Sequence, residues 1–518
     1  MIADARAELT SSRPSGKPGH TETWFRRILI LFSIVAGLGL LCHLGILLWA
    51  ENSFTGPEAV VAAQSMMLAR DGTLYYDLNH YPYTVCAYMP TLYLLEGGFY
   101  KLGVPAYTTG RLINFAAMLG IFALSWKIVL LYTRDRYCAW MAVLLAASSG
   151  LLLSWGTVGQ VDTLAAMFAL AAFYQYSRYE IGGERTLLWA GAFALLAFFT
   201  KQTMLACPAA IFVLLWFRGR RTAIQFGAGV AAVAAVLVLC FNTASSGRFL
   251  ASTVFANMNP HTWDKLLQHF RFAALSAGPL MLVAAAGARL VIRGAGRAVF
   301  VYLGFALTVF VLIASKIGSD LNYQIEFTIL LILAASLALH ALDFFRLSFN
   351  RTQTWVTLLQ LPLAVFLIVN FTITLRDVFT RAVIEQLTRG EIADMRPLLA
   401  GGGRVLSSDY NAMVRLRGRI DVEMLIYNWL VEAKLVNPEP VRRDIASAKF
   451  STILLGEDVN HRDPNLNVEL STLPEAQIDE IRRHYRLVER NSMGVYVYKP
   501  LELAVEGSRV QVCPPTCR

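Results

Sequence analysis

Four charged residues stand where long apolar stretches of this chain meet a loop: Glu58, Asp162, Lys201 and Lys316. When the apolar stretches are counted as membrane spans, all four charges are predicted to face the same side. A charge near hydrocarbon is costly, about 2.5–3.5 kcal/mol at the centre of a bilayer and less towards its interface. A carboxylate can accept a proton and an ammonium group can stabilise an anion, so the four together indicate a reaction site at a membrane surface.

The composition explains why spans must position these charges. The chain has 518 residues, of which 56% are hydrophobic and 16% are charged, and its mean hydropathy is +0.49. Soluble globular proteins average about 25% charged residues. Apolar runs of nearly 20 residues recur, which predicts a polytopic α-helical membrane protein. The net charge of +10 does not indicate nucleic acid, because the arginines are spread over short loops between apolar runs.

About eleven transmembrane helices are predicted. They cover residues 28–49, 108–132, 137–154, 162–177, 187–200, 203–217, 222–242, 270–292, 298–315, 323–342 and 353–375. Each predicted cytoplasmic segment carries at least two arginines, beginning with Arg26 and Arg27, as the positive-inside rule requires. We therefore expect a multi-pass protein of the cell (inner) membrane with a cytoplasmic N-terminus. The pair 187–200 and 203–217 could instead form one span, which would invert everything after it.

The predicted domains follow from the positions of the spans. They are a disordered cytoplasmic tail (1–25), a transmembrane domain (26–378) with a long first outer loop (50–107), a soluble α/β domain outside the membrane (379–500) and a tail (501–518). In the outer loop, helical spacing from Pro57 to Arg70 and many tyrosines predict short helices along the outer surface.

The predicted α/β domain contains recognisable strand and helix patterns. VLSSDY, STILLG and GVYVYK predict strands, whereas PEAQIDEIRRHYRLV predicts an amphipathic helix opened by Pro474.

The seven cysteines do not predict a disulfide framework. Cys42, Cys138, Cys207 and Cys240 lie in apolar spans and are expected to be small core residues. Cys513 and Cys517 could form a disulfide or belong to a free tail. Neither a CxxC pair nor an HExxH motif occurs, and no cofactor is predicted.

Four segments resemble a family of membrane enzymes. They are GPEAVVAAQSMMLARDGTLYYD, followed by YMPTLYLLEGGFYKLG and the Arg111-Leu112 pair; GQVDTLAAMFAL; FFTKQTMLACP; and SKIGSDLNYQIE. In this order they are similar to polytopic GT-C type glycosyltransferases that use polyprenyl-phosphate sugars. These include protein O-mannosyltransferases, the aminoarabinose transferase of lipid A and bacterial enzymes that decorate lipopolysaccharide cores. The resemblance implies transfer of one sugar from a polyprenyl-phosphate donor to a glycan, lipid or protein acceptor at the outer face of the membrane.

The resemblance also implies roles for the acids. Family members carry an acid, often an Asp-Glu pair, that is taken as the catalytic base. Here Pro57 precedes Glu58, so only the second acid matches; the alternative is that Glu58 is only an acid in the first turn of a helix, where the helix dipole favours it. One base is sufficient because phosphate leaves as a stable anion, and single displacement inverts the anomeric carbon. Asp162 is either a second functional acid or the N-cap of a helix.

The basic residues are assigned to the donor. Lys201, Lys316 and Arg111 are expected to bind its phosphate; the alternative is that the two lysines only extend from helix ends towards the interface. Residues expected to line the substrate site are Asp77, His80, Asn322, Tyr323 and Glu326, and a divalent metal held by such acids is a further option.

One departure from the family prevents assignment of the sugar. Relatives that act on lipid A have a lysine before a Pro-Pro pair, where this chain reads Ala87-Tyr88-Met89-Pro90.

Two other functions are compatible with the sequence. A transporter or flippase would place its polar groups near the middle of the bilayer on broken helices. A non-catalytic assembly factor with the same fold would explain the missing first acid at Pro57.

Overall fold

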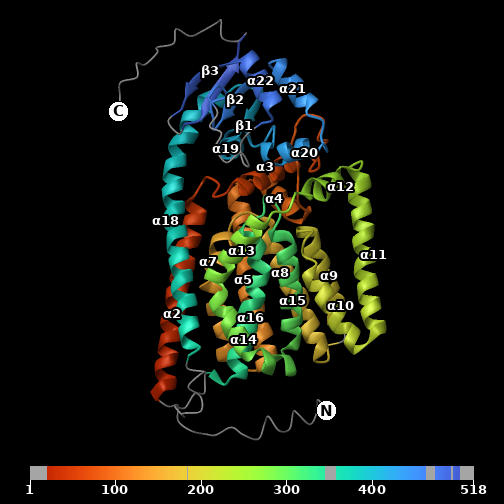
Figure 1. Cartoon of the computed structure of the whole chain (residues 1–518), viewed down its shortest axis with the longest axis vertical. Coiled ribbons are helices and arrows are strands. Elements are labelled where there is room, and N and C mark those ends of the chain that lie inside the picture. Colours follow the sequence, from red (N-terminus) through yellow and green to blue (C-terminus); the bar gives the residue numbers. More distant parts are fainter. Residues whose placement is uncertain (1–19, 184, 345–357, 462–472, 492–493, 502–518) are drawn as a thin grey trace.

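The computed structural model describes residues 20–183, 185–344, 358–461, 473–491 and 494–501. A bundle of helices forms most of the molecule, and a small sheet with its own helices lies at one end (Figure 1). Two long helices, α2 (His20–Trp49) and α18 (Gln360–Leu399), lie side by side at one edge of the bundle.

The remaining helices of the bundle follow the predicted apolar segments. They are α5 (Ala106–Thr133), α6 (Arg136–Ala147), α7 (Gly150–Gly156), α8 (Val161–Glu180), α9 (Thr186–Thr200), α10 (Ala206–Arg218), α11 (Arg220–Ala244), α13 (Trp263–Ser276), α14 (Gly278–Arg293), α15 (Arg297–Ala314) and α16 (Ile325–Ala341). Short helices connect some of them: α12 (Arg248–Thr253), η1 (Phe255–Asn257) and η2 (Leu321–Gln324).

Every predicted span overlaps a helix of the bundle. Fewer than eleven of the described helices, however, are both long enough and apolar enough to cross a membrane. Five helices in the described ranges are long and apolar enough to cross a membrane. The number rises to seven if the bent pairs α6–α7 (58°) and α13–α14 (73°) each count as one span. The segments 187–200 and 203–217 form separate helices, α9 and α10, broken at Lys201. Both are shorter than the roughly 20 residues of a straight span.

Burial separates the helices into inner and outer members. Helix α16 is buried on all faces, as its uniformly apolar sequence requires, and it packs against α14, α15 and α6. Helix α11 has only two buried residues and stands at the edge of the bundle opposite α2 (Figure 1). Such a mostly exposed apolar surface suits contact with lipid.

The first outer loop forms a layer between the bundle and the sheet (Figure 1). The predicted helix is confirmed as α3 (Gly56–Asp71), which has Pro57 in its first turn and the Thr55 hydroxyl as its N-cap; α4 (Thr91–Lys101) follows. Rather than lying on an open surface, α3 has nine buried residues and packs against α4, α5 and α19 (Tyr410–Arg417).

The C-terminal sheet has four strands in the order β1-β2-β4-β3: β1 (Arg404–Ser407), β2 (Phe450–Leu455), β3 (Tyr485–Arg490) and β4 (Tyr496–Pro500). Strands β1 and β2 are parallel, and the other pairs are antiparallel. Helices α20 (Met424–Glu432), α21 (Glu439–Ala446) and α22 (Glu475–His484) accompany them.

The three predicted strand segments are confirmed, but the predicted helix through PEAQIDEIRRHYRLV is wrong at its end. Helix α22 stops at His484 and the chain continues as β3, where Tyr485 pairs with Pro500 and Leu487 with Tyr498. Pairing with β4 gives this short segment backbone partners that outweigh its local helical pattern.

Hydrogen bonds hold the outer loop against the C-terminal region. The backbone N–H of Tyr83 donates to the carbonyl of Asp421, and the N–H of Glu423 donates to the carbonyl of Tyr83, each at 2.9 Å. The Glu385 carboxylate of α18 accepts from the N–H groups of Glu51 and Asn52 at 3.1 and 3.2 Å. These contacts fix the segment that leads into α3.

The cysteine predictions are partly wrong. Cys138 and Cys207 are buried as expected, whereas Cys42 and Cys240 are exposed on their helices. Cys513 and Cys517 lie outside the described residues.

Candidate active site

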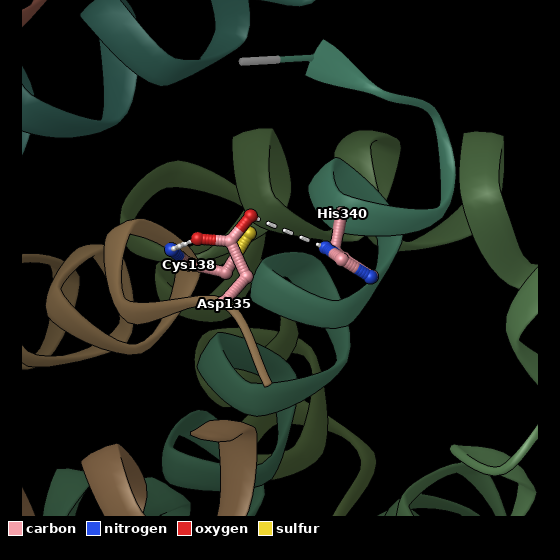
Figure 2. A group of neighbouring side chains, drawn as sticks. All are labelled: Asp135, Cys138 and His340. Carbon is pink, nitrogen blue, oxygen red and sulfur yellow. Dashed lines mark hydrogen bonds and ion pairs between the residues drawn. The ribbon is translucent and has the colours of Figure 1, made fainter. Parts of the chain in front are cut away.

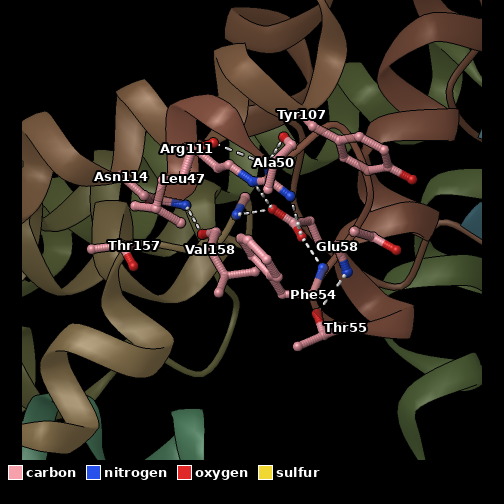
Figure 3. Close-up of polar contacts among 12 residues, drawn as sticks. Leu47, Ala50, Phe54, Thr55, Glu58, Tyr107, Arg111, Asn114, Thr157 and Val158 are labelled. Atoms are coloured by element: carbon pink, nitrogen blue, oxygen red, sulfur yellow. Dashed lines mark hydrogen bonds and ion pairs between the residues drawn. The ribbon is translucent and has the colours of Figure 1, made fainter. Parts of the chain in front are cut away.

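Glu58 lies in the first turn of α3 and forms a buried ion pair with Arg111 of α5 (Figure 3). Both side chains are only 1% exposed. Arg111 donates from Nε to Glu58 Oε1 at 2.8 Å and from Nη2 to Oε2 at 3.2 Å, which is a bidentate pair. The sequence places these residues 53 positions apart, and α3 packing on α5 brings them together.

The remaining donors of Arg111 are also used. Nη1 donates to the carbonyls of Leu47 at 3.1 Å and Ala50 at 2.6 Å, and Nη2 donates to that of Asn52 at 2.5 Å. A guanidinium has five N–H donors. All five therefore point to the end of α2 and to Glu58, and in this conformation Arg111 offers none to a donor phosphate, contrary to its predicted role.

The Glu58 carboxylate also has all its hydrogen-bond acceptor positions filled. Besides Arg111, Oε1 accepts from the N–H of Gly159 at 3.1 Å and Oε2 from that of Phe54 at 2.7 Å. A carboxylate has about four lone-pair sites, and four donors occupy them. This geometry suits a residue that holds the backbone in place more than one that accepts a proton from a substrate.

A short segment connects Glu58 to the second predicted acid. Val158 and Gln160 each accept a hydrogen bond from Asn114 Nδ2, at 2.6 and 2.7 Å, and Gly159 donates to Glu58. Residues 158–160 lead directly into α8, whose first turn carries Asp162. Glu58 and Asn114 thus set the position of Asp162 through the backbone.

Asp162 forms a second buried ion pair, with Lys201 at the end of α9; both side chains are 2% exposed. Oδ1 accepts from Lys201 Nζ, and Oδ2 accepts from Asn322 Nδ2 at 2.9 Å. The alternative that Asp162 caps α8 is wrong, because the N-cap is Gln160, whose side chain donates instead to the Thr55 hydroxyl at 2.9 Å.

A pocket adjoins this pair. Its polar lining comes from Lys201, Thr203, Asn322, Tyr323 and Glu326, and its apolar lining from Met204, α15 and Phe327 of α16. The Lys201 ammonium lies 3.9 Å from the centre of the Tyr323 ring, a cation–π contact. Glu326 accepts a hydrogen bond from the Tyr302 hydroxyl at 2.6 Å. Three of the five predicted lining residues are therefore brought together with Asp162 and Lys201.

Lys316 lies between α15 and η2, and its Nζ donates to the carbonyl of Asn257. Burial, together with the nearby positive charge of Lys201, lowers the pKa of Lys316. An anion bound near the two lysines would reduce their mutual repulsion.

Asp77 and His80 are placed differently. They form an exposed pair with each other, in which His80 Nδ1 lies 2.8 Å from Asp77 Oδ2. Between them, Asn79 accepts a hydrogen bond from the N–H of Asn437 in the C-terminal region. Their contacts are with the loop and this region, whereas the Glu58 and Asp162 pairs are buried.

Two residues near the site were not predicted. The segment that contains Tyr88 is held next to Lys201, because Gln202 Nε2 donates to the carbonyl of Ala87 at 2.9 Å. In the sequence, Tyr88 stands where relatives that act on lipid A have a lysine, and this departure was the signal that could have identified Tyr88. Arg381 of α18 and Arg111 both stack on the Phe54 ring, at 4.6 and 4.4 Å. No local pattern in the sequence links Arg381 to that loop.

A third buried carboxyl, Glu96 of α4, lies behind Glu58. Its Oε2 accepts from the Ser65 hydroxyl at 2.7 Å. Burial raises the pKa of Glu96 to about 8, and the charge of Glu58 contributes. Glu96 is therefore largely protonated at neutral pH.

Comparison with known proteins supports the resemblance predicted from the sequence. Residues 89–244 match the family of dolichyl-phosphate-mannose-protein mannosyltransferases. No curated protein sequence matches the chain significantly.

Solved structures give a second comparison. ArnT from Cupriavidus metallidurans bound to undecaprenyl phosphate aligns with a TM-score of 0.60 and 14% identity, covering 90% of this chain and 97% of ArnT. The apo state of ArnT gives a TM-score of 0.61 and 13% identity, with 91% and 98% coverage. Arabinosyltransferase EmbB from Mycobacterium smegmatis has a TM-score of 0.40, too low to establish a shared fold.

The chain therefore has the fold of ArnT. The matched family segment contains Arg111, Asp162 and Lys201. Fold and family segment together indicate a membrane glycosyltransferase of the GT-C type, as the sequence predicts.

Proposed function

We propose that the chain moves a single sugar from a polyprenyl-phosphate donor to a glycan, lipid or protein acceptor at the outer face of the cell membrane, with inversion. The observation that carries this proposal is the buried Asp162–Lys201 pair beside a pocket, in a chain with the fold of ArnT. ArnT has been crystallised with undecaprenyl phosphate, which supports a donor of the same class.

Asp162 is the better candidate for the catalytic base. Lys201 and Asn322 occupy two of its roughly four lone-pair sites, so it can still accept a hydrogen bond from an acceptor hydroxyl. Glu58, the base implied by the family resemblance, has all four sites occupied. In this proposal Glu58 and Arg111 are positioning residues that hold residues 158–160, and with them Asp162.

Lys201 binds the donor phosphate, with Lys316 beside it. The acceptor oxygen attacks the anomeric carbon, the bond from that carbon to the phosphate oxygen breaks, and the acceptor proton passes to Asp162. The polyprenyl phosphate leaves with the bonding electron pair, and the lysines stabilise its added charge. Asn322, Tyr323 and Glu326 line the donor side of the pocket.

Donor binding can also free the base. Without a donor, Lys201 neutralises Asp162. The donor phosphate is a diester that carries one negative charge, as a carboxylate does, and it competes for the same ammonium; the monoester that leaves carries more charge and binds the ammonium more strongly. When Lys201 turns to the phosphate, Asp162 loses one donor and gains the capacity to accept the acceptor proton. The order of binding would then be donor first.

The orientation of the chain is part of the proposal. Helix α3, which carries Glu58, lies at the end of the bundle that faces the C-terminal sheet (Figure 1). With a cytoplasmic N-terminus, this end and residues 379–500 are outside the membrane, where the acceptor is encountered.

A turnover assay with Asp162→Asn tests the proposal. The full-length protein in detergent is given a panel of polyprenyl-phosphate sugars and candidate acceptors, and release of polyprenyl phosphate is measured. We expect the wild type to release it and the variant to be at least ~100-fold slower, the lower end of a general-base effect. Asp77→Asn is the matched control, because Asp77 is an exposed acid of the same outer layer. Equal turnover by wild type and Asp162→Asn would exclude Asp162 as the base, and movement of intact donor without release would favour a transporter.

A further inference from the structure

A separate cluster of metal-ligating side chains lies at the other end of the bundle. Asp135 precedes α6, Cys138 lies in the first turn of α6, and His340 lies in the last turn of α16 (Figure 2). From Arg111 to the end of α5 is about 33 Å at 1.5 Å per residue, so this cluster is remote from the candidate active site.

The three side chains converge on one point. One ligand atom from each, the Asp135 carboxylate oxygen, Cys138 Sγ and the His340 ring nitrogen, all lie within 4.8 Å of one another. His340 Nδ1 is 3.5 Å from Asp135 Oδ2. Figure 2 shows the histidine ring and the carboxylate facing each other, with the cysteine sulfur beside the carboxylate.

Asp135 is held in place by its own backbone contacts. Its Oδ1 accepts from the N–H groups of Tyr137 and Cys138, at 2.8 and 3.4 Å, as the N-cap of α6. Oδ2 is thereby directed towards His340.

The types of the three ligand atoms indicate which class of metal ion the cluster would bind. Thiolate, imidazole and carboxylate together suit Zn²⁺, which binds them at about 2.3, 2.0–2.1 and 2.0–2.2 Å. Ligand atoms around a tetrahedral zinc are about 3.3–3.8 Å apart. The ligand atoms of this cluster lie within 4.8 Å of one another, so the most distant ones need to approach each other by about 1 Å.

We propose that Asp135, Cys138 and His340 bind a divalent transition metal ion of the zinc class, with water as the fourth ligand, and that the ion ties α6 to α16. Cys138 is buried, whereas the Asp135 and His340 side chains are 21% and 35% exposed, which gives the ion an approach and leaves room for the water. The two helices already pack against each other. The ion would add a fixed point at the end of α16 opposite Glu326.

Cobalt titration of the full-length protein in detergent tests this site. After treatment with a chelator, the wild type is expected to bind one Co²⁺ with a thiolate charge-transfer band that Zn²⁺ removes. Cys138→Ser is expected to lose the band, and His340→Ala to bind at least ~100-fold more weakly, the upper end of the effect of losing an outer-shell partner. Cys207→Ser, which changes another buried cysteine, is the matched control and should keep the band.

A measurement on the wild type covers the case in which a variant fails to fold. The zinc K-edge absorption spectrum of the zinc-loaded protein should show one sulfur ligand at about 2.3 Å with nitrogen and oxygen ligands. No bound metal after loading, a site without sulfur, or a charge-transfer band that survives in Cys138→Ser would overturn the proposal and leave Asp135 and His340 as an ion pair.

Discussion

Replacement of Glu58 by glutamine separates a positioning role from a catalytic one. The carboxylate accepts four hydrogen bonds, two from Arg111 and two from backbone N–H groups. A glutamine side chain has one oxygen and one NH₂ group. Whichever way the amide is turned, its NH₂ faces two N–H donors, and the buried Arg111 charge loses its counter-ion.

The size of the effect follows from burial. Removing one partner of a buried ion pair costs about 3–5 kcal/mol, because the other charge stays uncompensated. Glu58→Gln should lower the free energy of unfolding by that amount. The control is Glu51→Gln: Glu51 pairs with Arg415 at the surface, where the two side chains are 55% and 32% exposed, and surface pairs contribute about 0–1 kcal/mol.

The assay is reversible unfolding of the purified protein in detergent, with turnover measured on the same preparations. The double variant Glu58→Leu/Arg111→Met should recover most of the lost stability, since an apolar pair of similar volume can replace a buried ion pair. If Glu58→Gln stays within about 1 kcal/mol of the wild type while turnover falls ~100-fold, Glu58 is the base and the positioning argument is refuted.

Three further predictions concern single residues. Lys201→Met should weaken equilibrium binding of a polyprenyl phosphate by about 10–100-fold, which corresponds to the loss of one hydrogen bond to a charged group. The affinity for the acceptor should not change. Equal affinity of wild type and variant for the polyprenyl phosphate would exclude a role for Lys201 in phosphate binding. Because the pKa of Glu96 is raised from 4.5 to about 8, the folded state holds a proton that the unfolded state has released, so this group makes stability fall as pH rises between those values. Glu96→Gln should flatten that fall in unfolding experiments from pH 5 to 8, and an unchanged slope would show that Glu96 is not its source. Gly110→Ala should lower the free energy of unfolding by about 1–3 kcal/mol, because the new Cβ would overlap the Glu96 carboxylate and lie 3.0 Å from Gly159 Cα. Gly98→Ala, with open space around its Cβ, should not destabilise the protein. Equal stability of the two variants would contradict the packing at Gly110.

The sequence predicts the elements that depend on local pattern. Apolar runs mark the positions of the bundle helices, and Pro57 with the helical spacing after it identifies α3. Charges at the ends of apolar runs point to Asp162 and Lys201, because a charge near hydrocarbon persists only with a partner or a function.

Such local patterns do not predict contacts between segments that are distant in the sequence. Arg111 looks like a free cation in the sequence, yet packing of α3 on α5 directs all its donors to Glu58 and the end of α2. Likewise, Asp162 fits an N-cap locally, but the helix begins one residue after Gln160, which leaves the carboxylate for Lys201. In both cases a tertiary partner decides the role of the side chain.

A structure of the protein with a bound polyprenyl phosphate tests the central claim most directly. The account predicts a phosphate oxygen about 2.7–2.9 Å from Lys201 Nζ, with the Asp162 carboxylate released towards the pocket. A phosphate bound elsewhere, with the Asp162–Lys201 pair unchanged, would contradict it.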